Sequence, residues 1–331
     1  MKSRAGTLAA PFPYFGGKSL ACAKVWEALG DCPNYVEPFA GSLAVLLGRP
    51  HKPSIETVND KDGFVANFWR AVSFDAPSVA KYCDWPVNEN DLYARHLWLV
   101  GKGEWLTESL HADPGFFDAK IAGWWCWGLC CWIGDGWCDG KGVYKKMPSI
   151  SSTGVNRKIL YLSSLGQGVF RKNVSIYAWF AALQNRLRRV LVACGDWRRV
   201  TGPSVTVHNG VTGVFLDPPY TTANMDYSAG GVGGLLAGDV REWCSENGSN
   251  PRLRIVLCGH AGEHDELLRH GWGTRKWKAI VGMARSEEAV SRSKSETIWC
   301  SPHCLPEKYL QMSIFEEVGT LPHYSAARRT R

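Results

Sequence analysis

Residues 213–227 read GVFLDPPYTTANMDY. The apolar run at residues 214–216 follows turn-forming residues, which predicts a short buried strand. The two prolines after it end the strand, because neither can donate a hydrogen bond to a sheet and both fix φ. Asp217 is therefore expected at the carboxyl end of the strand, with Tyr220 on a rigid turn just beyond it. In open α/β sheets ligands bind at this edge, so the stretch favours a binding site over an ordinary strand end with a solvated aspartate.

Strand-like and helix-like segments alternate on both sides of this stretch. On the N-terminal side, we expect strands at residues 35–36 and 56–58, and helices at residues 19–29 (Ser19 as N-cap, Gly30 as stop), after the turn at Gly41, and at residues 64–72. On the C-terminal side, we expect strands at residues 190–193 and 253–258, helices at residues 175–189, 239–246 and 264–270, and two paired β segments around residues 277–283 and 297–300. This alternation predicts a doubly wound α/β sheet.

The middle of the chain does not follow this rhythm. Residues 75–174 are rich in Trp, Gly and Cys, and we interpret them as an inserted domain. The α/β domain is then discontinuous and consists of residues 11–74 and 175–315, with flexible termini at residues 1–10 and 316–331.

The charge of the chain is unevenly distributed. The net charge is +7, yet residues 140–195 contain no acidic residue and hold ten of the 38 basic ones, so the remainder is slightly acidic. A basic block on an otherwise balanced protein is typical of proteins that bind a polyanion, most often nucleic acid. The alternative is a chance clustering of solvated surface charge.

Composition also excludes some classes of protein. No run approaches the roughly 20 apolar residues of a membrane span, and the polar N-terminal segment is unlike a secretory signal. We therefore expect an intracellular protein whose 12 cysteines are free thiols. The spacing of Cys126, Cys130, Cys131 and Cys138 is not a zinc pattern. We expect no metal and interpret residues 124–138 as a packed aromatic helix, with metal binding or stacking of one or two Trp on DNA as alternatives.

Four segments carry a resemblance to a known family. They are PYFGGK (residues 13–18), EPFAGS (37–42), Asn59-Asp60 and DPPY (217–220). In this order the chain resembles the Dam-like (alpha-group) DNA N6-adenine methyltransferases. The resemblance covers roughly residues 11–70 and 175–300 and matches the insert by position only. One departure is Leu43, which stands where the family usually has a second glycine and which we expect to narrow the turn.

The resemblance implies a fold, a cofactor and site residues. The fold would be a Rossmann-like S-adenosylmethionine-dependent methyltransferase sheet with an inserted, mainly helical DNA-recognition domain. By carry-over, the residues that bind S-adenosylmethionine would be Tyr14, Lys18, Gly41, Asp60, Asp196 and Asp217, and the catalytic residues would be Asp217, Pro218 and Tyr220. Asp60 would hold the ribose hydroxyls, and Asp196 would contact the adenine edge.

Methyl transfer to an exocyclic amine would explain the residues of the DPPY motif. The exocyclic amine of adenine is a poor nucleophile, because its lone pair is delocalised into the ring. Two acceptors at its N–H groups, the Asp217 carboxylate and the Pro218 carbonyl, would free that lone pair and stabilise positive charge developing on nitrogen. The target base must leave the duplex to be reached, and the ring of Tyr220 would stack on it.

The basic block is the expected contact with double-stranded DNA. The predicted phosphate contacts are Lys145, Lys146, Arg157, Lys158, Arg171 and Lys172. The expected location is the cytoplasm of a prokaryotic or phage-infected cell, with an unlinked restriction enzyme as an open possibility and no membrane partner. Two other functions remain open. One is amine methylation of cytosine N4 or RNA, and the other is a non-catalytic DNA-binding protein that keeps the fold.

Overall fold

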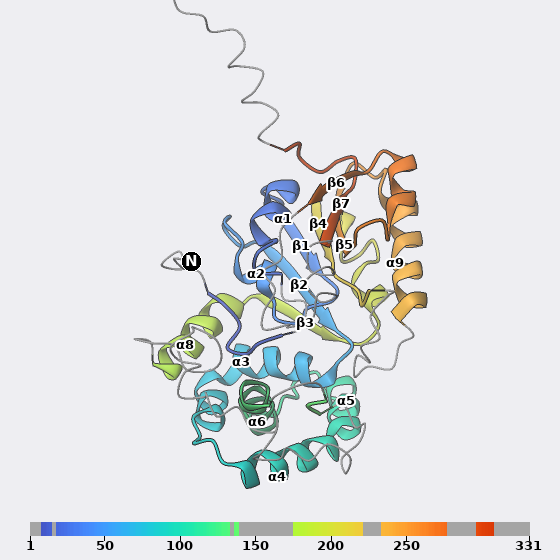
Figure 1. Cartoon of the computed structure of the whole chain (residues 1–331). Coiled ribbons are helices and arrows are strands. Elements are labelled where there is room, and N and C mark those ends of the chain that lie inside the picture. The colour runs from blue at the N-terminus through green and yellow to red at the C-terminus, as the bar shows by residue number, and fades with distance from the viewer. Residues whose placement is uncertain are drawn as a thin grey trace, which may run out of the picture.

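The computed structural model describes residues 8–14, 18–132, 136–138, 175–220, 233–276 and 296–307. Within these residues a seven-stranded sheet has the order β3-β2-β1-β4-β5-β7-β6 (Figure 1). The strands are β1 (Asn34–Glu37), β2 (Ile55–Asp60), β3 (Val190–Cys194), β4 (Thr212–Leu216), β5 (Leu253–His260), β6 (Gly273–Lys276) and β7 (Glu296–Cys300). The first five strands in this order are parallel, whereas β7 is antiparallel to both of its neighbours.

The strand order reverses between β1 and β4. From β1 the chain moves outward to β2 and later to β3, and it then returns to the other side of β1 as β4. Ligands of open α/β sheets bind in the crevice at such a switch point, outside the carboxyl ends of the strands. The α/β fold class predicted from the sequence is confirmed, and its switch point lies where β1 and β4 end.

Helices cover both faces of the sheet. They are α1 (Cys22–Leu29), α2 (Ala44–Leu47), α3 (Gly63–Cys83), α8 (Ile176–Leu187) and α9 (Gly233–Asn247), with 3-10 helices η1 (Trp197–Val200), η2 (Val207–Asn209) and η3 (Asp265–His270). Side chains alternate across a strand, so Phe215 packs in a core with α1, α3 and α8, while Val214 and Leu216 pack with η1, α9 and η3. Figure 1 accordingly shows α1 and α9 on opposite sides of the sheet.

Helix α3 links the sheet to the segment interpreted as an insert. It is longer than the predicted helix at residues 64–72 and passes through a kink at Asp75 (φ −144°, ψ 63°), two residues before Pro77. The predicted domain boundary falls at this kink. Below it lie α4 (Glu89–Val100), α5 (Gly103–Ala112) and α6 (Ala119–Cys131), as Figure 1 shows. Since α3 and α6 share one core, residues up to 132 form a helical layer continuous with one face of the sheet.

The Trp/Cys-rich stretch is a packed helix up to residue 131, as predicted. On α6, Trp125, Cys126 and Trp127 are buried. The ring of Trp127 lies 4.2 Å from the guanidinium of Arg95, which is enclosed by two further indoles and buried. All twelve cysteines of the chain are free thiols. Among the described residues, no group of three or more His, Cys, Asp or Glu could hold a metal ion.

Three predicted elements are placed differently. The first helix begins at Cys22 with Ala21 as N-cap, so the assignment of Ser19 as the cap is wrong. The helix expected at residues 264–270 is the 3-10 helix η3. Of the late β pair, β7 is confirmed and its partner β6 ends at Lys276, while residues 277–283 lie outside the described part. No helix among the described residues is both long and apolar enough to cross a membrane.

Candidate active site

A cavity of about 330 Å³ opens at the switch point of the sheet. Its wall is built from the segments that follow β1, β2, β3 and β4, which is the edge where parallel strands of this fold bind ligands. The eight residues predicted for catalysis or cofactor binding all lie on this wall: Tyr14, Lys18, Gly41, Asp60, Asp196, Asp217, Pro218 and Tyr220. The volume is within the range typical of small-molecule sites.

The turn after β1 and the end of β2 form one hydrogen-bonded unit. The backbone N–H of Gly41 donates to Oδ2 of Asp60 at 2.9 Å, and the indole of Trp69 donates to the carbonyl of Gly41 at 2.8 Å. Gly41 has φ +44°, and a Cβ there would lie 2.7 Å from Cε1 of Tyr14. Only glycine therefore allows both this backbone conformation and the close packing of the Tyr14 ring.

Asp60 is an acid held in a low-polarity position. Burial and the nearby charge of Asp62 together raise the pKa of its carboxyl to about 7, against the opposing hydrogen bonds from the backbone N–H groups of Gly41 and Asp62. Its two oxygens accept from those two backbone groups, at 2.9 Å each. A carboxylate fixed in this way is suited to accept hydrogen bonds from ligand hydroxyls.

Leu43 does not act as the sequence suggested. Its backbone is left-handed (φ 52°, ψ 28°), which explains why a glycine would suit this position. Its side chain is fully buried in the core next to α2, and the cavity wall is formed instead by Ser42 and Ala44. The expectation that the Leu43 side chain narrows the turn at the cavity is therefore wrong.

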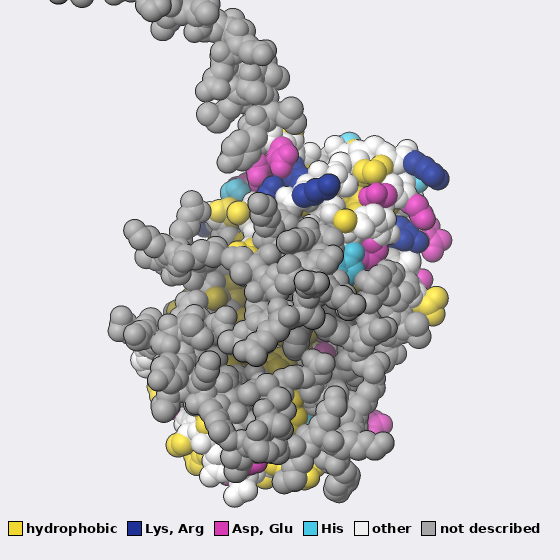
Figure 2. Space-filling model, in the orientation of Figure 1, with side chains coloured by type: hydrophobic (Ala, Val, Ile, Leu, Met, Phe, Trp, Pro, Cys, Tyr) yellow, Lys and Arg dark blue, Asp and Glu magenta, His cyan; other side chains and the backbone are white. Residues whose placement is uncertain are grey.

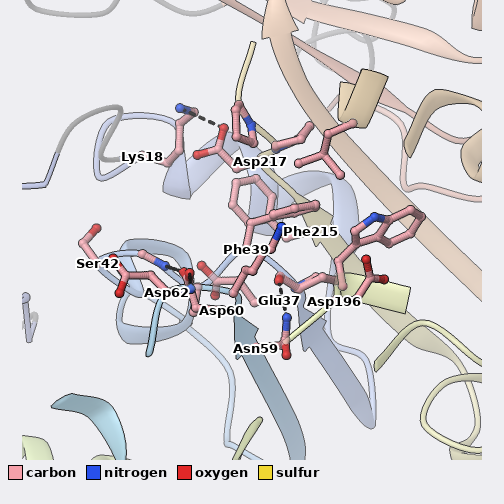
Figure 3. A pocket seen from close by; sticks show the side chains of 18 of the residues that line it. Lys18, Glu37, Phe39, Ser42, Asn59, Asp60, Asp62, Asp196, Phe215 and Asp217 are labelled. Carbon is pink, nitrogen blue, oxygen red and sulfur yellow. Dashed lines mark hydrogen bonds and ion pairs between the residues drawn. The ribbon is translucent and has the colours of Figure 1, made fainter. Parts of the chain in front are cut away.

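The segments PYFGGK and DPPY meet at one end of the cavity. Nζ of Lys18 lies 3.0 Å from Oδ1 of Asp217, and the hydroxyl of Tyr220 donates to the same oxygen at 3.2 Å. The Lys18 ammonium also lies 5.1 Å from the centre of the Tyr220 ring. Figure 3 shows this pair apart from Asp60 and Asp196, with Phe39 between the two groups.

The Lys18–Asp217 pair is a buried ion pair. Lys18 is 4% exposed. Burial alone would lower the pKa of Lys18, but the charge and hydrogen bond of Asp217 together with the nearby Cys258 and Glu296 outweigh it, so the pKa is raised. Burial also raises the pKa of Asp217, while Lys18 and the Tyr220 hydroxyl act in the opposite direction. The ammonium is thus protonated, and it is the group that favours the ionised form of Asp217.

The first residue of the EPFAGS motif is part of the wall as well, although the sequence reasoning used only its glycine. Oε2 of Glu37 accepts from the hydroxyl of Tyr35 at 2.9 Å and from the N–H of Leu46 at 3.2 Å, whereas Oε1 has no donor among the described residues. Burial raises the pKa of Glu37 to about 8 against these two hydrogen bonds. The acid directly before Pro-Phe was the available signal for this residue.

The opposite end of the cavity is partly aromatic. Asp196 follows β3, accepts from the backbone N–H of Arg198 at 2.9 Å and is about half exposed. The neighbouring Trp197 is buried, and its ring lies 6.2 Å from that of Phe39 at an angle of 31°. Its Nε1 has no acceptor within the described part of the chain. The sequence indicated Asp196 here, but not the indole beside it.

Two other residues near Asp217 were not singled out as site residues. His260 ends β5, and its ring lies 4.7 Å from that of Tyr220. Glu296 begins β7 directly opposite His260 in the sheet register. No local sequence pattern identified Glu296.

The predicted phosphate contacts cannot be placed, because Lys145, Lys146, Arg157, Lys158, Arg171 and Lys172 lie outside the described residues. From Glu89 to Cys131, acidic residues outnumber basic ones six to three, so helices α4 to α6 carry a net negative charge. Figure 2 shows Lys or Arg interspersed with Asp and Glu over the described surface near α9 and β6. Of the basic block, the structure describes Arg186, Arg188 and Arg189, and the last two are exposed.

No protein-family model and no curated protein matches this chain.

Proposed function

We propose that this protein is an S-adenosylmethionine-dependent methyltransferase that methylates adenine N6 in DNA. The observation that carries the proposal is the meeting of four separate segments in one cavity. PYFGGK supplies an ammonium to the DPPY carboxylate through the 3.0 Å contact of Lys18 and Asp217, while the Gly41–Asp60 unit lies on the same wall.

The wall fits the proposed cofactor in shape and in donor chemistry. S-adenosylmethionine supplies a methyl group on a positively charged sulfur. Gly41 lines the cavity and its lack of a side chain lets the Tyr14 ring pack closely against it, and the Asp60 carboxylate can accept from ribose hydroxyls. Glu37, a buried acid without a counter-ion in the described part of the chain, lines the same cavity, and a cationic group bound there would favour its ionised form.

The charge of the wall argues against a dinucleotide cofactor. Six acidic and three basic side chains line the cavity. Phosphates would meet a net negative wall, whereas a cofactor with an ammonium and a sulfonium gains from it. The observation therefore supports a methyl donor over a nicotinamide cofactor, for which the sequence also lacks the glycine fingerprint.

The arrangement at Asp217 suits amine activation. Asp217 offers a carboxyl group whose pKa is raised by burial, while the charge of Lys18 opposes that rise and favours the ionised form. Pro218 adds a backbone carbonyl on the same rigid turn. Two such acceptors would bind the two N–H groups of an exocyclic amine and stabilise the positive charge that develops on nitrogen during transfer. The Tyr220 ring beside them is available as a stacking surface for an extruded base.

The proposal is tested by separating transfer from binding. Asp217→Ala should abolish methyl transfer to unmethylated plasmid DNA while DNA affinity stays close to that of the wild-type protein. Asp31→Ala is the matched control, because Asp31 is 70% exposed and pairs only with Arg49, at 3.6 Å, among its described neighbours. Full activity of Asp217→Ala would rule out the assigned role of the DPPY aspartate.

A further inference from the structure

The resting contacts of Asp217 conflict with its proposed role. Oδ1 already accepts from the Tyr220 hydroxyl and contacts the Lys18 ammonium. A target amine becomes positively charged during transfer, and an ammonium on the same carboxylate opposes that charge in a buried site. Lys18 therefore has to leave Asp217, or be neutralised by another group, before the Asp217 carboxylate can stabilise the positive charge on the amine.

A second carboxylate is present where this ammonium could go. Glu296 is the first residue of β7, and β7 pairs with β5, which itself pairs with β4 at whose end Asp217 lies. The strand partner of Glu296 is His260, whose ring contacts that of Tyr220. Asp217, Tyr220 and Glu296 are therefore at the same edge of the sheet.

The Glu296 side chain has capacity for a new partner. Its Oε2 is buried and has no hydrogen-bond partner in the described part of the chain. Burial raises the pKa of Glu296, while the charge of Lys18 lowers it and that of Asp217 raises it. The three charged groups thus interact with one another. An acceptor without a donor is costly in such a position, and an ammonium would satisfy it.

We propose that Glu296 is a positioning residue that takes over the Lys18 ammonium when Asp217 accepts the target amine. The inference rests on the proposed methyl transfer. Lys18 then pairs with the Glu296 carboxylate while the positive charge that develops on the amine pairs with Asp217. The two positive and two negative charges balance, and no buried charge is left alone. Asp217 is then free to bind the amine, with the Tyr220 hydroxyl still orienting it.

The test compares two variants of Glu296. Glu296→Gln is uncharged and cannot form an ion pair with the Lys18 ammonium, whereas Glu296→Asp keeps a carboxylate and can. Exposed Glu246 on α9 provides the matched control Glu246→Gln. Cofactor dissociation constants and kcat on unmethylated plasmid DNA are measured for all three variants and the wild-type protein. We expect Glu296→Gln to lower kcat about tenfold or more with cofactor affinity unchanged, Glu296→Asp to recover most of the rate, and Glu246→Gln to behave as wild type.

Two results would overturn the inference. In the first, Glu296→Gln keeps a kcat within about twofold of the wild-type value. In the second, Glu296→Gln and Glu296→Asp lose cofactor affinity and rate together, which indicates a structural role. Absence of transfer by the wild-type protein is a different result, because it refutes the proposed function itself.

Discussion

The backbone N–H of Gly41 donates to the carboxylate of Asp60 at 2.9 Å, so the turn after β1 and the end of β2 are held as one unit. This contact joins two segments whose order is visible in the sequence but whose hydrogen bond is not. It also fixes the geometry of the side of the cavity where the ribose of the cofactor is proposed to bind.

Substitution of Gly41 should damage this unit more than the fold. In Gly41→Ala the new methyl group meets the Tyr14 ring at 2.7 Å, and the left-handed backbone adds about 1–2 kcal/mol of strain. We expect cofactor affinity to fall by at least about tenfold, as measured by calorimetric titration. Gly202→Ala is the control, since nothing lies within 4 Å of a Cβ at Gly202. Equal affinities of the two variants would contradict the packing seen at Tyr14.

Cofactor binding should weaken in acid because of Asp60. The pKa of Asp60 is raised from 3.8 to about 7, so the acid is increasingly protonated below neutral pH and loses capacity to accept from ribose hydroxyls. We expect the affinity for S-adenosylmethionine to fall by up to about tenfold per pH unit below pH 7. Asp60→Asn should bind more weakly with a flatter pH profile, whereas Asp31→Asn should retain the wild-type profile.

The stability of the ligand-free protein should fall as pH rises. Glu37 has its pKa raised from 4.5 to about 8, so between these values the folded state holds a proton that the unfolded state has released. The free energy of unfolding should therefore decrease across this range, by on the order of 1 kcal/mol per pH unit for a single such group. Urea unfolding across this pH range should show that the free energy of unfolding depends less on pH in Glu37→Gln than in the wild-type protein. The cationic cofactor should counteract the decrease, because it favours the ionised acid.

At position 43 the glycine variant should be more stable than the alanine variant, which reverses the usual order of stability. Loss of this buried side chain costs about 3 kcal/mol in Leu43→Ala, whereas Leu43→Gly regains about 1 kcal/mol because glycine adopts φ 52° freely. Leu46, buried within α2, is the control, and there glycine should be the less stable variant. Thermal or urea unfolding of the four variants measures both differences. A more stable Leu43→Ala than Leu43→Gly would contradict the left-handed backbone.

DNA binding should depend on the basic block. If Lys145, Lys146, Arg157 and Lys158 contact phosphates, their replacement by glutamine should weaken binding. It should also reduce the slope of log K against log salt by about 0.9 for each contact. Replacement of Lys52 and Lys81, which are exposed and outside the block, should leave the slope unchanged. An unchanged slope in the fourfold variant would show that these four residues do not contact the phosphates of the DNA.

The sheet edge could be predicted from the sequence because its signals are local. An apolar run followed by Asp217 and two prolines has one good structural solution, and parallel strands bring such ends together without knowledge of the strand order. Gly41, Asp60 and Lys18, which the family resemblance implied as site residues, also lie on this cavity wall, but the sequence could not give their hydrogen bonds.

Other features depend on contacts that no local pattern reveals. Glu296 comes close to the site through the antiparallel register of β7 and β5, which pairs residues far apart in the chain. Glu37 occupies a strand position where an acid is usually exposed, and only the packing around Tyr35 shows that it is buried. Helix α3 continues past Pro77 because Asp75 absorbs the kink and α6 packs against the helix beyond it, so tertiary contacts override a residue that normally ends a helix.

The most direct test of the proposed reaction follows labelled methyl from S-adenosylmethionine into unmethylated DNA, with enzymatic digestion and analysis of the nucleosides. Methylation of adenine N6 predicts label in N6-methyladenine, and its absence when the Asp217→Ala variant is used. Label in N4-methylcytosine alone would contradict the target base, and no labelled nucleoside would contradict the proposed reaction.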